Sequence, residues 1–193
     1  MITPQPSNFA FIGRVWPELL IHCRNAEQSA VSNPRVAGIE ARFTLERLVD
    51  HIVEAYGLRS VSDWNLNDKL NHRSFKDRVN QRIHDKMNVL RRFGNDAAHN
   101  PDHIDPERAV RAIGQLFDIL VWAAVNVARP PLERTKLPTF DRSIVYNAPK
   151  QRQRSQQEIA KLNQQLQKAA KEIETTKLLL TEREETWRQE RKA

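Results

Sequence analysis

Apolar side chains recur at intervals of three and four residues along most of this sequence, which is the spacing of one face of an α-helix. The pattern predicts helices over residues 18–31, 36–56, 77–98 and 106–128, with a short helix around Leu66 and Leu70. Only Leu137 to Tyr146 could form a short strand, and no other segment alternates apolar and polar residues as a half-buried strand does. The sequence therefore predicts an all-α fold.

Helix-breaking and capping residues punctuate this pattern. Pro17 either kinks one long helix or begins a second, and Asn33-Pro34 marks a turn before the next helix. Gly57 is a natural stop for that helix, and Asp105-Pro106 combines a capping residue with a proline at the first helical position. Four parts follow: a disordered N-terminus over 1–7, a helical bundle over 8–129, a Pro-containing linker over 130–149, and a coiled-coil helix over 150–193.

The last part has a stricter repeat than the bundle. From residue 150 the composition changes to Gln, Glu, Lys, Arg and Leu, and the seam positions alternate between three- and four-residue steps, with Arg183 filling one of them. Such a seam of about four heptads is typical of a coiled coil, although a single solvated helix is the alternative. The seam consists of Ile159, Leu162, Leu166, Ala169, Ile173, Thr176, Leu180 and Trp187.

Charge is unevenly distributed over the 193 residues. The net charge is +7, and the segment from Pro130 onward holds 14 basic and 9 acidic residues, so the bundle is nearly neutral and the tail is basic. A basic tail allows contact with nucleic acid. The apolar stretch 112–128 carries polar residues and is short for a bilayer span, so we expect a core helix and no membrane association.

Few residues suggest chemistry on their own. The sequence has no phosphate-binding Gly-rich loop and no nucleophile or zinc-protease motif. Its one cysteine, Cys23, lies on an apolar face and fits a core thiol in a cytoplasmic protein. His99 and His103, with Asp102 and Asp105, could bind zinc, but Pro101 breaks the helix that would align them. We predict no cofactor and no metal.

The segment Leu90-Arg-Arg-Phe-Gly-Asn-Asp-Ala-Ala-His99 carries the most information. On a regular helix Arg92, Asn95 and His99 share one face, opposite the apolar stripe. Arg can hold a phosphate and His can act as a general acid or base, so these three residues are the candidate catalytic set. The alternative is the solvated face of an amphipathic helix, in which Gly94 allows close packing and Asn95 and His99 bond to the backbone.

The same segment resembles a domain of unknown function at the amino end of type I restriction endonuclease R subunits, in which a coiled coil also follows. The resemblance extends to Ser7-Asn8-Phe9, Ala26-Glu27, Pro34, Arg42-Phe43-x-x-Glu46 and Val121-Trp122. That domain is in turn similar to the HEPN superfamily of helical domains, so the resemblance implies a HEPN-like helical bundle over 8–129. Many HEPN domains are RNases that place an Arg, a polar residue and a His on one helix and work across a dimer. The arginine that is regular in the R-subunit domain corresponds to Arg91, whereas Arg92 has the HEPN spacing to His99.

The resemblance implies an accessory or assembly domain that acts in DNA restriction or phage defence through protein or nucleic-acid contacts. Its expected partners are other restriction-system subunits, a second copy bound through the coiled coil, and DNA or RNA. Two alternatives stay open: a metal-independent HEPN-type RNase of a defence or toxin system, and a coiled-coil adaptor with no nucleic-acid role.

Overall fold

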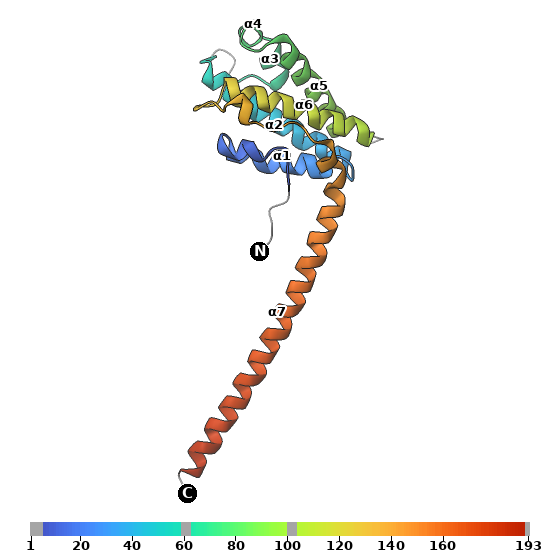
Figure 1. Ribbon diagram of the computed structural model, residues 1–193. Helices are drawn as coiled ribbons and strands as arrows, with labels where there is room; N and C mark the ends of the chain where they lie inside the picture. Colours follow the sequence, from blue (N-terminus) through green and yellow to red (C-terminus); the bar gives the residue numbers. More distant parts are fainter. Residues whose placement is uncertain (1–5, 59–62, 100–103, 192–193) are drawn as a thin grey trace. The chain divides into compact units, whose positions relative to one another are not determined.

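The computed structural model describes residues 6–58, 63–99 and 104–191, which fall into two compact units, Met1–Pro149 and Lys150–Ala193. Residues 1–5 of the predicted disordered N-terminus lie outside the described residues. Helices make up both units, and the described residues contain no strand, which confirms the all-α prediction (Figure 1).

The first unit is a bundle of helices in the order that the sequence predicts. After the 3-10 turn η1, Ala10–Arg14, come the helices α1 to α6, the 3-10 turn η3, Arg134–Lys136, and the beginning of α7. Their bounds are α1 Pro17–Ser29, α2 Pro34–Ala55, α3 Leu66–Asn71, α4 Arg73–Lys76, α5 Gln81–His99, α6 Pro106–Asn126 and α7 Arg142–Glu190.

Helix α2 is the centre of this bundle, because it packs against α1, α5 and α6 and also touches α3 (Figure 1). Its apolar stripe is fully buried at Leu45, Leu48 and Ile52, and it joins one continuous core with Leu90 of α5 and Ile113 of α6. Burial of several such side chains on each helix, at roughly 1.5–3 kcal/mol per side chain, is what holds helices of this length together.

Local signals set the ends of α2. The side chain of Asn33 accepts a hydrogen bond from the Val36 amide at 3.3 Å, and Pro34 begins the helix. At the other end Gly57 has φ +65°, while the amides of Gly57 and Leu58 donate to the carbonyls of Glu54 and Val53. This is the Schellman ending that a glycine after the last helical residue favours.

Pro17 begins α1 and does not kink it, and Asp105 caps α6 through the amides of Glu107 and Arg108. Helix α6 is long and apolar enough to cross a membrane by composition, but 61% of its most apolar window is buried inside the bundle. That burial explains its apolar composition as that of a core helix.

The segment predicted as a linker is only partly extended. Neither a strand nor a linker forms over 142–149, because α7 already begins at Arg142 and buries Val145 and Ala148 in the first unit. Asp141 starts this helix by accepting the Ser143 amide at 2.8 Å. Pro149 lies inside α7, about two turns beyond its start, and the helix continues through it.

A buried asparagine fastens the start of α7 to the N-terminal segment. Asn8 is 3% exposed; its Oδ1 accepts the Asp141 amide at 2.7 Å, and its Nδ2 donates to the Asp141 carbonyl at 3.0 Å. The same Nδ2 donates to the carboxylate of Glu27 at 2.8 Å.

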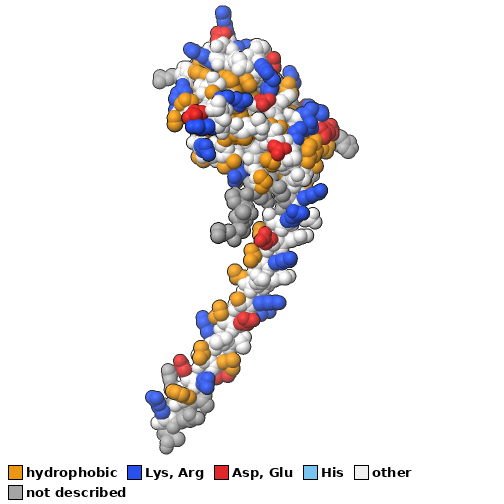
Figure 2. Space-filling view, viewed as in Figure 1, with side chains coloured by type: hydrophobic (Ala, Val, Ile, Leu, Met, Phe, Trp, Pro, Cys, Tyr) orange, Lys and Arg blue, Asp and Glu red, His pale blue; other side chains and the backbone are white. Residues whose placement is uncertain are grey.

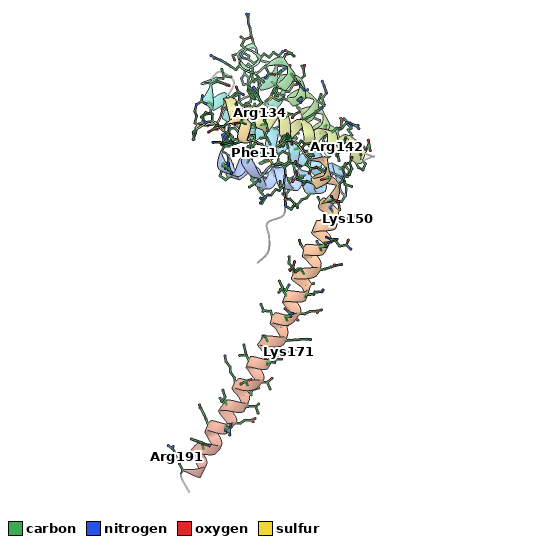
Figure 3. All side chains as sticks on the ribbon, viewed as in Figure 1. Phe11, Arg134, Arg142, Lys150, Lys171 and Arg191 are labelled. Carbon is green, nitrogen blue, oxygen red and sulfur yellow. The ribbon has the colours of Figure 1, made fainter. Side chains whose placement is uncertain are left out.

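The second unit consists of the long remainder of α7. The exposed fractions of its seam residues are large, from 48% at Leu162 to 71% at Leu166. Figure 2 shows hydrophobic side chains recurring along this helix among charged ones, and Figure 3 shows side chains extending from it between the labelled Lys150 and Arg191. The long C-terminal helix is therefore confirmed, with its apolar stripe uncovered in the single chain.

Candidate functional site on helix α5

Two glycines let α5 approach α2 unusually closely. A Cβ at Gly94 would lie 2.3 Å from the Cβ of Arg42, and a Cβ at Gly38 would lie 2.5 Å from the Cβ of Ala97. Neither distance leaves room for a methyl group, so glycine is required at both points of the crossing. The expectation that Gly94 serves close helix packing is confirmed.

This close approach places Arg42 of α2 against the Gly-Asn step of α5. The Arg42 guanidinium donates from Nη1 to the side-chain oxygen of Asn95 and from Nε to Glu46 at 3.0 Å. Asn95 is thus held by a residue 53 positions earlier in the chain, in a polar contact that spans the two central helices. Its side-chain oxygen is occupied by a structural contact.

The other two members of the predicted set lie apart from this contact. Arg92 is exposed, and His99, the last residue of α5, is exposed as well. Arg92 and His99 therefore lie on the solvated side of α5, as the helical spacing predicts. Asn95 instead contacts Arg42 of α2. The arginine that shares the surroundings of Asn95 is Arg91, the alternative arginine of the motif.

Arg91 and Asn95 line a cavity of about 380 Å³ between α5, α2 and the beginning of α3. Successive turns of α2 form one wall, one turn of α5 forms another, and the segment leading into α3 closes a third side. The lining residues are Arg42, Glu46, Asp50, Trp64, Asn65, Leu66, Asn67, Lys69, Arg91 and Asn95.

The charges of this cavity do not balance. Lys69, which is 8% exposed, donates to Asp50 at 2.7 Å, and Arg42 pairs with Glu46, so both carboxylates already have a cation. Arg91 forms no ion pair with any described residue, and its Nε is buried without a hydrogen-bond partner among them. One guanidinium therefore remains uncompensated.

The electrostatic surroundings of Arg91 are unfavourable to its charge. Burial lowers the pKa of its guanidinium, and the neighbouring positive charges of Arg92 and Arg42 lower that pKa further. Because an arginine in a protein stays protonated, the outcome is a charged group that an anion would stabilise.

The remaining chemical candidates are Cys23 and the zinc alternative. Cys23 is fully buried, and burial raises the pKa of its thiol to about 12, as expected for a core thiol and not for a nucleophile. Of the zinc alternative, Asp102 and His103 lie outside the described residues. The described residues contain no group of three or more His, Cys, Asp and Glu side chains that could hold a metal ion.

Sequence reasoning did not find that Trp64 and Lys69 line the cavity. It also did not find that, of the two adjacent arginines of the motif, Arg91 is the one that lines it. The segment around Trp64 is irregular in the sequence and carries no helical pattern that would orient it. A usable signal existed for Arg91, which is four residues before Asn95 and so shares its face of α5. Which of the two arginines meets α2 depends on how the helices pack.

A family model described as a domain of unknown function, DUF4145, matches residues 24–139, more than half of the chain. The protein therefore belongs to the DUF4145 family. The matched range includes α2 to α6 and every residue that lines the cavity, whereas the second unit lies outside it. Searches of curated proteins and of solved structures gave no match.

Proposed function

We propose that this protein is a self-associating accessory module that acts in the cytoplasm, in DNA restriction or phage defence. In this proposal the α7 tail joins two copies, and the helical body provides contacts to other subunits or to nucleic acid. The observation that carries it is the apolar stripe of the second unit, which follows a heptad repeat and is exposed throughout. The restriction context rests on the resemblance of the Leu90–His99 motif and the helix that follows the body.

The heptad period indicates that the occupant of this stripe is another helix of the same kind. Residues at strict three- and four-residue steps stay on one side only if the helix supercoils around a partner. With Ile159, Leu166, Ile173 and Leu180 as a positions, the polar Thr176 is a d position. Its hydroxyl donates to the Glu172 carbonyl at 2.7 Å, so it can enter a seam without an unpaired group.

Charge complementarity favours a second copy in parallel orientation. In the same register Glu172 is a g position and Lys177 is the following e position, which meet across a parallel pair of identical helices. Each copy would supply one partner of both ion pairs. A partner with a different sequence would have no such constraint.

Sedimentation velocity tests self-association directly. Ile159→Asp together with Ile173→Asp should convert the wild-type oligomer to a monomer, because each places a carboxylate in the seam. Leu178→Asp is the matched control: Leu178 is 60% exposed on the same helix but lies at an outward f position. A wild-type monomer at micromolar concentration, or equal effects of the seam and control variants, would contradict the proposal.

The parallel orientation of the two α7 helices can be tested separately. Glu172→Lys should weaken the dimer, and adding Lys177→Glu should restore it, because the double variant only exchanges the two charges across the interface. Each pair contributes about 0.3–0.5 kcal/mol, so thermal unfolding of the dimer at low salt is the suitable measurement. Failure of the double variant to recover would exclude the parallel register.

The nucleic-acid part of the proposal rests on the basic tail. Fluorescence anisotropy with duplex DNA should show affinity that falls steeply as salt rises, since binding through phosphates releases counterions. Affinity that is absent at low salt would leave the assembly role with protein contacts alone.

A further inference from the structure

The cavity between α2, α3 and α5 has a use that self-association of the tail does not require. We propose that it binds a nucleotide, with the phosphate on Arg91 and the planar base against Trp64. The ligand is a nucleoside monophosphate, either free or as the terminal nucleotide of a strand. The inference concerns the body alone and stands independently of the proposed assembly role.

The first argument is the missing partner of Arg91. Buried polar groups in proteins are nearly always hydrogen-bonded, and the Nε of Arg91 is buried with no partner among the described residues, so this guanidinium is open to an added anion. Both carboxylates of the cavity are already paired, Glu46 with Arg42 and Asp50 with Lys69. The partner of Arg91 therefore has to come from outside these residues.

The second argument is the type of anion. Arg91 lies near two further guanidinium groups, those of Arg42 and Arg92, whose charges lower its pKa. Arg42 is paired with Glu46 and Arg92 is exposed, so the cavity itself carries one unpaired positive charge, that of Arg91, which favours an anion. Planar guanidinium groups also match the oxygens of phosphate in paired hydrogen bonds.

The third argument is the aromatic side chain at the same cavity. Trp64 remains 44% exposed while lining it, and its ring is held edge-on by His72, with the two ring centroids 5.1 Å apart. An exposed tryptophan fixed in this way is a platform for stacking a base. A volume of about 380 Å³ lies at the small end of ligand sites, which suits one nucleotide and not a long strand.

Isothermal titration of the full chain with adenosine monophosphate tests the inference, with adenosine and inorganic phosphate as the two partial ligands. The nucleotide should bind at least ten-fold more tightly than either part. Arg91→Gln should weaken nucleotide binding at least ten-fold. Arg82→Gln is the matched control, because it removes the same charge from an exposed position of the same helix and should change affinity less than three-fold.

Trp64→Ala provides a second variant that does not threaten the fold, since the side chain is largely exposed. It should weaken the nucleotide and leave inorganic phosphate unchanged, whereas Trp64→Phe should retain most of the affinity. Equal losses in the Arg91 and Arg82 variants would show non-specific charge attraction and overturn the site. Indifference to Trp64→Ala, or no binding of the nucleotide at millimolar concentration, would also overturn it.

Short single-stranded oligonucleotides distinguish the two sources of the ligand. If the site takes a strand end, an oligonucleotide with a 5′-phosphate should compete with the monophosphate and its unphosphorylated twin should not. If neither competes while the monophosphate binds, the ligand is a free nucleotide. The seam variants of the tail should bind the nucleotide like the wild type, so failure of self-association and failure of this site are separate results.

Discussion

Apolar residues recur at three- and four-residue steps in both the helical body and the α7 tail, but they are buried in the body and exposed in the tail. In α2 the apolar residues cover a broad face, and α1, α5 and α6 pack against this helix. Leu45 and Leu48 are therefore fully buried. In the tail Ile159 and Ile173 are 52% and 57% exposed in the single chain. Burial in the body is therefore supplied by the chain itself, whereas the tail stripe stays exposed in the single chain.

This difference separates the sources of stability. The body should unfold as one unit with a melting temperature that does not depend on protein concentration. If the tail self-associates as proposed, it should have a transition that does depend on concentration, because its apolar contacts would then be intermolecular. Substitutions in the body should therefore change its concentration-independent melting temperature, whereas substitutions in the tail seam should change the concentration-dependent transition.

Gly94→Ala should have the largest effect on the body. The added methyl group would overlap the Cβ of Arg42, which is fixed to the backbone of α2 and cannot turn away, so the two helices must separate. We expect a loss of about 3 kcal/mol in the free energy of unfolding, measured by urea denaturation of the seam-variant monomer.

Gly114→Ala is the control for that change, since its added methyl group would lie 3.3 Å from a ring carbon of Phe140 and the helix gains propensity. It should alter stability by less than about 1 kcal/mol. Equal losses at the two glycines would show that the α2–α5 crossing is not the tight point of the body.

Asn8→Ala should have the next largest effect, a loss of about 2 kcal/mol in the free energy of unfolding of the body. It removes the acceptor of the Asp141 amide, in a partly buried bond, and a donor to Glu27, in a buried one. Thermal unfolding checks the effect, with Asn147→Ala on the exposed side of α7 as the control. Because Asn8 belongs to the body, tail association in sedimentation should be retained; its loss would show that the two regions are coupled.

Glu27→Gln should change the pH dependence of body stability by a smaller amount. Burial raises the pKa of the Glu27 carboxyl above its ordinary value, so folding favours the protonated form. The wild type therefore loses stability as pH rises from the ordinary pKa of a glutamate through the raised value. The glutamine keeps an oxygen to accept the Asn8 side chain and cannot ionise.

The expected result is a melting-temperature difference in favour of Glu27→Gln that is near zero at about pH 4 and grows toward neutral pH. Glu54→Gln, at an exposed position of α2, should give a flat difference over the same range. A variant that loses stability increasingly as pH rises would show that the carboxylate is stabilised by its neighbours more than burial penalises it.

His99→Ala should have the smallest effect on stability, within about 0.5 kcal/mol, since the residue is exposed at the end of α5. The expected bond from His99 to the turn at Asn100-Pro101 involves residues outside those described. Thermal unfolding of this variant, together with an RNA cleavage assay without metal, distinguishes a catalytic motif from the solvated face of a packing helix. RNA cleavage by the wild type that His99→Ala abolishes would establish the RNase alternative.

The local features of this protein are determined by the sequence itself. Asn33, Gly57 and Asp105 act on backbone groups within a few residues, so their roles at helix ends could be predicted from neighbours along the chain. The heptad seam of the tail is also local, because the three- and four-residue steps fix which side of a helix is apolar whatever lies opposite. The requirement for glycine at position 94 is different, because it comes from the Cβ of Arg42 on α2 and therefore from the packing of the two helices.

Only the tertiary structure decided the rest. Arg91 and Arg92 are adjacent and chemically identical, and it is the packing of α2 and α3 on one side of α5 that puts Arg91 in the cavity and leaves Arg92 in solvent. The pairing of Arg42 with Asn95 joins residues 53 positions apart, and helical wheels give no information on such pairs. Residues 142–149 became helix and not linker because Val145 and Ala148 find a buried place in the body, a gain in apolar burial that local propensity does not contain.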